Sequence, residues 1–83
     1  MNVTVFTLPN CQQCRMTEKR LDLLGIPHDV VNLRELPSMP EWAVTAGYVT
    51  APLVRAERED GTAAHWSGFR PDLIALLVPK EDS

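Results

Sequence analysis

Two cysteines, Cys11 and Cys14, follow the first apolar segment of the chain, at the point where a helix is expected to begin. Residues three apart on a helix lie one turn from each other, with about 5 to 6 Å between their Cβ atoms. A disulfide can close across this distance with little backbone adjustment. The first cysteine would lie at the helix N-terminus, where unpaired N–H groups and the positive dipole end favour a thiolate. The spacing therefore indicates a dithiol, with Cys11 as the candidate nucleophile.

Length and composition indicate one small domain. The 83 residues are 45% hydrophobic, without the run of ~20 apolar residues that a membrane helix needs. Asn2, Thr4 and Thr7 interrupt the first segment, so no secretory signal is visible and a reducing cytoplasm is expected. The net charge of -3 argues against nucleic acid as a partner, because phosphate binding needs clustered positive charge. We expect a domain over residues 1–78 and a frayed tail over 79–83.

Residue types along the chain predict the order β-α-β-α-β-β-α. Segments rich in β-branched residues between turn signals indicate strands, and proline-free stretches that end at a glycine indicate helices. The expected strands are 1–7, 26–33, 52–57 and 62–66, and the expected helices are 11–24, a short one ending at Gly47, and 71–77. The β-α-β start favours a parallel strand pair, and Asp60-Gly61 favours an antiparallel hairpin.

The two later helices have start signals of their own. Ser38 and Glu41 fit an S-x-x-E capping box, with Pro40 tolerated in the first turn. Pro71 suits a first helical position, and Asp72 is favoured by the helix dipole. These signals place one helix before the hairpin in the sequence and the other after it.

The cysteine pair has three possible interpretations: a redox dithiol, two buried apolar cysteines, or half of a metal site. Redox chemistry is favoured for a Cys-x-x-Cys within a β-α-β pattern in the cytosol. A closed zinc site needs four ligands, and His28 and His65 stand at no characteristic spacing from the cysteines. The two histidines are expected to have no catalytic part, because disulfide exchange at a helix end requires no histidine base. Trp42 and Met16 are interpreted as packing residues.

Three separated segments together resemble the NrdH-redoxins, which are glutaredoxin-sized members of the thioredoxin superfamily. They are Cys11-Gln12-Gln13-Cys14, Thr50-Ala51-Pro52 and Trp66-Ser67-Gly68-Phe69-Arg70-Pro71-Asp72. The similarity extends from about Val3 to Leu77, and Gly47-Tyr48 also fits it. Family members commonly carry lysine where this chain has Leu8, and valine or methionine where it has Gln12. The hairpin at 59–61 is longer than usual in the family.

The resemblance implies an α/β thioredoxin fold with a four-stranded mixed sheet and three helices. It also implies that Pro52 is cis and faces the dithiol, so that the backbone of Ala51 can pair with an extended substrate peptide. From the residues alone, Pro52 could instead simply open a strand in the common trans form. The loop after the fourth strand is expected to replace a glutathione-binding surface and to be held by hydrogen bonds around Arg70. Its substrate-binding residues would be Trp66, Ser67, Gly68, Phe69 and Arg70.

By the same resemblance, the protein is a thiol-disulfide oxidoreductase that binds no cofactor or metal. The Cys11 thiolate attacks a substrate disulfide, and Cys14 then resolves the mixed disulfide. Thioredoxin reductase, which holds the NADPH and FAD, would reduce the oxidised pair, and the electrons would pass to the large subunit of class Ib ribonucleotide reductase. A cytoplasmic monomer without membrane or nucleic-acid partners is expected. The alternatives are a glutathione-dependent glutaredoxin and a non-catalytic zinc or iron-sulfur module formed between two chains.

Overall fold

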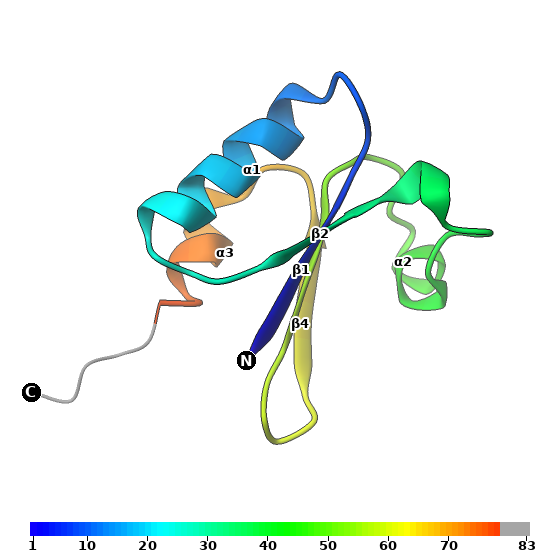
Figure 1. The fold of residues 1–83 in the computed structure, drawn as a ribbon. Coiled ribbons are helices and arrows are strands. Elements are labelled where there is room, and N and C mark those ends of the chain that lie inside the picture. Colours follow the sequence, from blue (N-terminus) through cyan, green and yellow to red (C-terminus); the bar gives the residue numbers. More distant parts are fainter. Residues whose placement is uncertain (79–83) are drawn as a thin grey trace, which may run out of the picture.

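The computed structural model describes residues 1–78, which form a four-stranded mixed sheet with helices on both faces (Figure 1). The strands are β1 (Asn2–Thr7), β2 (Asp29–Asn32), β3 (Leu53–Glu57) and β4 (Ala63–Ser67). The helices are α1 (Gln12–Leu23), η1 (Leu33–Glu35, a 3-10 turn), α2 (Glu41–Ala46) and α3 (Pro71–Ala75). The strand order is β2-β1-β3-β4, with β1 parallel to β2 and antiparallel to β3, and β3 antiparallel to β4. The predicted thioredoxin fold is confirmed, while the expected tail at 79–83 lies outside the described residues.

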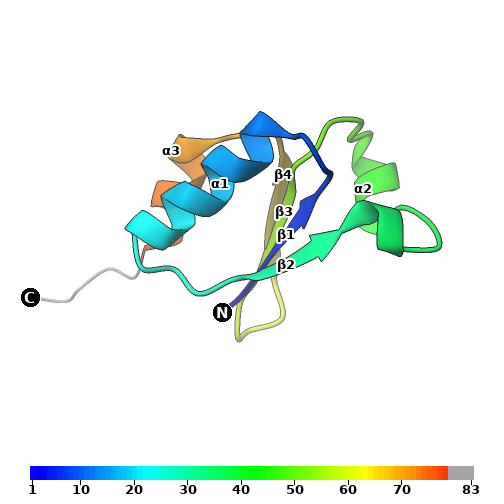
Figure 2. The ribbon, with the colours of Figure 1, turned by 45° about the horizontal axis from the view of Figure 1, so that its top comes forward.

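The hydrophobic core lies between the sheet and the helices α1 and α3, which cover the same face (Figure 2). Alternate residues of a strand point to opposite faces, and on this face β1 contributes Val3 and Val5 while β3 contributes Val54. Leu21 of α1 and Ile74 of α3 are fully buried against them. Packing in this core thus fixes α1, and with it the cysteine pair, against the central strands β1 and β3.

Helix α2 lies on the opposite face of the sheet and contacts it through the side chain of Trp42. The indole of Trp42 lies edge-on to Phe6 of β1, with ring centroids 5.6 Å apart, and 5.1 Å from the ring of His65 on β4. The guanidinium of Arg55 lies 5.3 Å from the Trp42 ring centroid, a cation-π distance. The prediction that Trp42 is a packing residue is confirmed, and His65 belongs to this cluster.

The second strand is shorter than predicted, and Ile26, the first residue assigned to it, instead takes part in the end of the preceding helix. Gly25 has φ 68°, and its N–H donates to the carbonyl of Asp22. The N–H of Ile26 donates to the carbonyl of Leu21, which completes a Schellman motif at the end of α1. Ile26 is therefore buried in the core without joining the sheet, and β2 begins only at Asp29.

Strand β2 also ends one residue earlier than predicted. The side chain of Asn32 accepts a hydrogen bond from the N–H of Arg34 at 2.9 Å and caps the short turn η1. Leu33 therefore begins a 3-10 turn instead of ending the strand. Asparagine side chains readily make such local bonds, and this competition with strand pairing explains the difference.

The capping box predicted at Ser38 and Glu41 is wrong. Helix α2 begins at Glu41, its N-cap is Pro40, and no side chain bonds to its first turn. The carbonyl of Pro40 accepts the first helical bonds, from Ala43 and Val44. Ser38 thus lies too early in the chain to cap the helix. The predicted terminator is confirmed, since Gly47 has φ 77°.

Two expectations about packing also need correction. Met16 was interpreted as a packing residue, but its side chain is 41% exposed on α1. The closing helix ends at Ala75 and not at Leu77, and Leu76 from its apolar set is 77% exposed. Only the residues that face the sheet are covered, namely Ile74 within α3 and Leu77 just after it.

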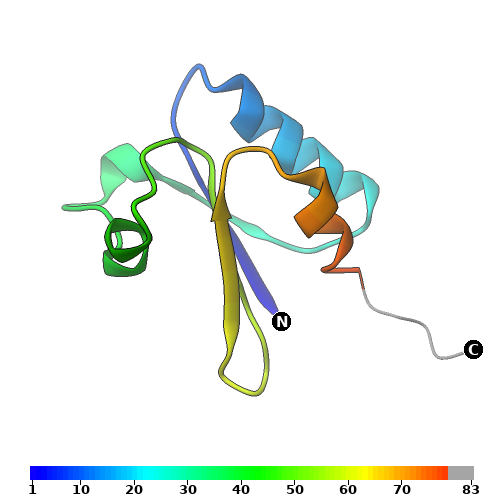
Figure 3. The same cartoon turned by 180° about the vertical axis from the view of Figure 1, so that it is seen from behind.

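Three connections meet at one end of the sheet. In the strand register, Phe6 of β1 pairs with Leu53 of β3, and Leu53 pairs with Ser67 of β4. The end of β1, the start of β3 and the end of β4 are therefore level, and each continues into a loop on the same side. Figure 3 shows these loops at one end of the molecule and the β3–β4 hairpin at the other.

Candidate active site

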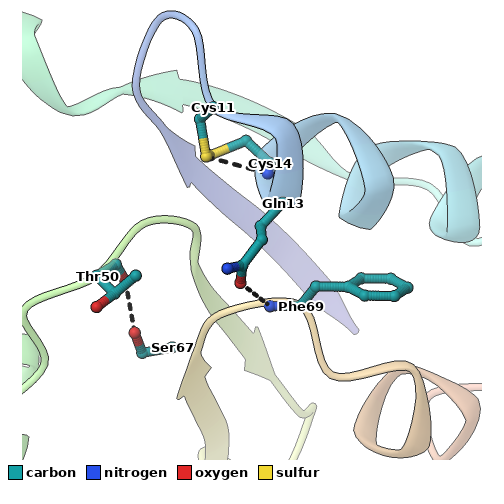
Figure 4. The surroundings of a disulfide bond; sticks show 6 residues. All are labelled: Cys11, Gln13, Cys14, Thr50, Ser67 and Phe69. Carbon is teal, nitrogen blue, oxygen red and sulfur yellow. Dashed lines mark hydrogen bonds between the residues drawn. A yellow bond between two sulfur atoms is a disulfide. The ribbon is translucent and has the colours of Figure 1, made fainter.

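The two cysteines form a disulfide at the N-terminal tip of α1, at the end of the sheet where the three loops meet (Figure 4). Their Cα atoms are 5.2 Å apart. Cys11 is the N-cap residue and is half-buried, whereas Cys14 lies inside the first turn and is only 2% exposed. The sulfur at position 11 is therefore the one that a large partner can reach first.

The environment of the Cys11 sulfur favours a negative charge. Its Sγ accepts a hydrogen bond from the N–H of Cys14 at 3.1 Å, which is the interaction that an N-cap side chain makes. The first turn of α1 contains no acidic residue, and Arg15 adds a positive charge directly after it. The helix dipole acts in the same direction, so the reduced form favours a thiolate at this position.

The turn before β3 contains a cis peptide bond between Ala51 and Pro52, as the resemblance implied. Pro52 is fully buried, and its carbonyl accepts the N–H of Gly68 at 2.8 Å. Within residues 1–78, no hydrogen bond uses the backbone N–H or carbonyl of Ala51. The main chain at Ala51 thus remains open to pairing with another segment.

The end of β4 and the loop after it are held in place by three hydrogen bonds, two to the turn before β3 and one to α1. The hydroxyl of Ser67 donates to the carbonyl of Thr50, and the N–H of Gly68 donates to the carbonyl of Pro52. The N–H of Phe69 donates to the side-chain oxygen of Gln13 at 3.0 Å. The dithiol helix and the two loops are thereby joined into one surface.

Sequence reasoning did not assign a role to Gln13, although it stands between the two cysteines. Its oxygen lies 3.3 Å from the position that a Cβ would occupy at residue 68, and Gly68 has φ 86°. Glycine is needed there both for the backbone conformation and for the close approach. The signal in the sequence was the glycine inside Trp66–Arg70, but nothing local identifies its partner, which is distant in the chain.

Arg70 interacts with its neighbour and not with the rest of the loop. Its guanidinium donates to both carboxylate oxygens of Asp72, at 3.1 and 2.8 Å. These hydrogen bonds lower the pKa of Asp72 below its usual range and raise the pKa of Arg70. Within the described residues the loop is therefore held by Ser67, Gly68 and Phe69, and the expected hydrogen-bond network around Arg70 is limited to this exposed pair.

The two aromatic residues that were assigned to the substrate surface lie in different environments. Trp66 is only 5% exposed and belongs to the hydrophobic core under α1 and α3. Phe69 is half-buried, and its ring extends alongside α1 (Figure 4). Phe69 also borders a shallow groove with Met16 and Leu23 on the exposed side of α1. Of the two, only Phe69 offers accessible apolar surface, and this surface lies along α1.

No group of three or more histidine, cysteine or acidic side chains within residues 1–78 is arranged to hold a metal ion. In the same region, no helix has the length and apolar character needed to cross a membrane. His28 and His65 both lie away from the cysteines, one bonded to the carbonyl of Ile26 and the other beside Tyr48. The arrangement that remains is an accessible sulfur beside a buried one, which suits thiol-disulfide exchange.

Comparison with known families and proteins gives consistent matches. The family model for glutaredoxin matches residues 3–59. The glutaredoxin-like protein NrdH of Salmonella typhimurium is 34% identical over 79 residues, which cover 95% of this chain and 91% of that protein. The NrdH protein of Lactococcus lactis subsp. lactis is 37% identical over 76 residues, covering 92% and 99%.

Solved structures show the same similarity. The NrdH-redoxin of Escherichia coli, a glutaredoxin-like protein described as having a thioredoxin-like activity profile, matches with a TM-score of 0.82 at 31% identity. The match covers 98% of this chain and all of that one, at 100%. A glutaredoxin from Archaeoglobus fulgidus shares the fold, with a TM-score of 0.69 at 18% identity over 94% of this chain and 86% of that one.

Proposed function

Because this chain belongs to the glutaredoxin family, among its NrdH-redoxins, and is a thiol-disulfide oxidoreductase with a Cys11–Cys14 redox pair, we propose that it carries electrons between two protein partners. The electron source is thioredoxin reductase, and the acceptor is the large subunit of a class Ib ribonucleotide reductase. NADPH and FAD belong to the reductase. The site of action is the cytoplasm, and the carrier is a monomer.

The exchange proceeds in two substitutions at sulfur. The thiolate of Cys11 attacks one sulfur of the substrate disulfide, forms a mixed disulfide and releases the first substrate thiolate. The thiolate of Cys14 then attacks the Cys11 sulfur, closes the internal disulfide and releases the second substrate thiol. Two electrons pass to the substrate, and the exposure difference between the cysteines supports this order, since only Cys11 is accessible.

The paired donors of the loop after β4 support a protein reductant over glutathione. To bind a small anionic thiol, this loop would have to offer free N–H groups or a free cation beside the reacting sulfur. Here the N–H of Gly68 donates to Pro52, the N–H of Phe69 donates to Gln13, and Arg70 is paired with Asp72. This internal pairing is the observation that carries the proposal. The thioredoxin-like activity profile described for the E. coli relative agrees with it.

The substrate is expected to bind in extended form beside the turn before β3. Ala51 would supply main-chain hydrogen bonds, in the manner of a strand added to a sheet edge. Ser67 and Gly68 would hold the neighbouring loop, Phe69 would supply apolar contact, and Trp66 would support the loop from the core. Arg70 would border the site through its exposed pair with Asp72.

The direct test is an assay of NADPH consumption with thioredoxin reductase, this protein and a protein disulfide substrate. We expect turnover that depends on this protein, and little turnover when glutathione with glutathione reductase replaces thioredoxin reductase. Equal or faster turnover with glutathione would show a glutathione-dependent glutaredoxin instead. A purified class Ib ribonucleotide reductase then tests the acceptor, through deoxyribonucleotide formation.

The order of the two cysteines gives a separate prediction. Cys14→Ser should accumulate a mixed disulfide between Cys11 and the substrate, because the resolving thiol is missing. Cys11→Ser should accumulate none, since the buried Cys14 cannot reach the substrate. Non-reducing gels and mass spectrometry of the trapped species provide the measurement. A mixed disulfide through Cys14 would reverse the assigned roles.

A non-catalytic metal module is tested on protein purified without oxygen. Zinc, iron and sulfide are measured together with free thiols, and two titratable thiols per chain are expected. A stoichiometric metal that blocks these thiols would support a zinc or iron-sulfur module shared between two chains. Alkylation at neutral pH adds a second check, because the carrier requires Cys11 to react.

A further inference from the structure

We propose that Gln13 is a positioning residue, which sets the distance between the dithiol and the substrate-binding loops through its hydrogen bond to the backbone of Phe69. The side chain of Gln13 reaches from α1 to the loop after β4 (Figure 4). Its oxygen accepts the N–H of Phe69 at 3.0 Å, across a sequence separation of 56 residues. No other hydrogen bond within residues 1–78 joins the dithiol turn to this loop.

The effect of this bond extends beyond Phe69. The preceding residue, Gly68, donates its N–H to the carbonyl of Pro52 at 2.8 Å, so the loop contacts the turn that contains Ala51. The Gln13 oxygen also fills the space beside Gly68, where a Cβ would come within 3.3 Å. Successive hydrogen bonds thus connect the start of α1 to the loop after β4, and this loop to the turn before β3. The first of these connections is made by the Gln13 side chain alone.

The geometry of thiol-disulfide exchange gives the hydrogen bond between Gln13 and Phe69 a function. A substrate disulfide must bind along the loops beside Cys11, and a loop that is already fixed in place loses less conformational freedom on binding, which favours affinity. The loop itself is short and packs through few side chains, so hydrogen bonds decide its position. We infer that Gln13 acts on substrate binding and leaves the reactivity of Cys11 unchanged.

The test compares three variants, and the same substitution by methionine is made at the two adjacent glutamines. Gln13→Met keeps the length of the side chain and removes the acceptor, while Gln13→Glu keeps an acceptor for the Phe69 N–H. Gln12→Met is the control, because Gln12 is exposed and forms no hydrogen bond through its side chain within residues 1–78. A disulfide-linked peptide pair serves as substrate, and dithiothreitol serves as reductant.

For Gln13→Met we expect KM to rise about fivefold with kcat unchanged, which corresponds to the loss of one neutral hydrogen bond. Gln13→Glu should keep the KM of the unmodified protein. Its added charge disfavours the Cys11 thiolate, so kcat at neutral pH should fall, and the pH dependence of alkylation measures this separately. Gln12→Met should match the unmodified protein in both constants.

Hydrogen exchange at the Phe69 amide reports the hydrogen bond itself. Exchange should be slow in the unmodified protein and in Gln13→Glu, and faster in Gln13→Met. Faster exchange in Gln13→Met with an unchanged KM would overturn the proposal, as would failure of Gln13→Glu to preserve KM or an equal KM rise in Gln12→Met. The inference deepens the substrate site proposed above, but dithiothreitol replaces the reductase in this assay. A negative result therefore leaves the choice of thioredoxin reductase and ribonucleotide reductase untouched.

Discussion

Cys11 and Cys14 are close in the sequence and in space, yet their exposures differ because α1 turns the second sulfur toward the sheet. Cys14 is 2% exposed, and Cys11 caps the helix at the surface. The spacing alone predicted a dithiol and the helix N-terminus predicted the nucleophile. Burial of Cys14 agrees with its helical spacing, because it shares one face of α1 with Thr17 and Leu21, which are also buried.

Thr17, one turn after Cys14, is fully buried and its hydroxyl has no hydrogen-bond partner within the described residues. A buried polar group without a partner costs free energy, so the nearly isosteric Thr17→Val should stabilise the oxidised protein by about 1 kcal/mol. Urea unfolding monitored by circular dichroism gives the change in the free energy of unfolding. Thr45→Val on the exposed side of α2 is the control and should change it by less than about 0.5 kcal/mol. Loss of stability in Thr17→Val would mean that the hydroxyl has a partner.

The pair of Arg70 and Asp72 gives a prediction of pH dependence. Its hydrogen bonds lower the pKa of Asp72 in the folded protein. A lowered folded-state pKa stabilises the fold above the unfolded carboxyl pKa, and this contribution is lost as the pH falls through the folded value. Arg70→Gln should move the pKa of Asp72 back up toward its usual range in an NMR titration. Asp60, whose pKa is lowered by Thr62, should titrate unchanged as the internal control. An unchanged pKa of Asp72 would show that Arg70 is not the cause.

At the scale of elements, the site is formed where three loops meet at one end of the sheet, with Cys11 as the reacting group at the end of the first loop. The hydrogen bonds from Ser67 and Gly68 reach the turn before β3, and the bond from Phe69 reaches α1. The sequence motif Trp66–Asp72 indicated an important loop. The hydrogen-bond partners of this loop could not be predicted, because hydrogen bonds between residues distant in the sequence leave no periodic pattern.

Gly68→Ala tests this junction against a matched glycine. Gly68 and Gly61 have φ values of 86° and 90°, so alanine at either position should cost about 1 to 2 kcal/mol in the free energy of unfolding. Only at Gly68 would the new Cβ press on the Gln13 oxygen, while Gly61 has nothing within 4 Å. We expect kcat/KM for a peptide disulfide to fall in Gly68→Ala and to stay unchanged in Gly61→Ala. Equal activity of the two variants would contradict the role of the close approach.

On the scale of the whole molecule, the sheet separates two sets of contacts. One face packs on α1 and α3 and holds the dithiol helix, and the other carries the cluster of Trp42, Phe6 and His65. In so small a domain the total free energy of unfolding is only about 5 to 15 kcal/mol. One buried side chain can therefore account for a large fraction of the stability of the whole domain.

Ile74 is the test of that dependence, because it is fully buried and is the buried residue of α3. Ile74→Ala should lower the free energy of unfolding by about 2 to 5 kcal/mol through lost burial and the cavity that remains. Leu76→Ala removes a similar side chain that is 77% exposed, and should change it by less than about 0.5 kcal/mol. Denaturant unfolding of both variants measures the difference. Similar losses in the two would mean that α3 is not fastened by its buried face.

The local features of this protein could be predicted from its residues alone. The order of strands and helices, the dithiol at a helix start, the hairpin at Asp60 and the glycine terminators all depend on residues a few positions apart. The three-dimensional packing was needed to show that Gln13 contacts Phe69, that Ser67 contacts Thr50, and that Trp66 lies in the core. These contacts depend on strand register and on which loops reach the same end of the sheet. Propensity and periodicity describe neighbours along the chain, and the site is assembled from residues that are neighbours only in space.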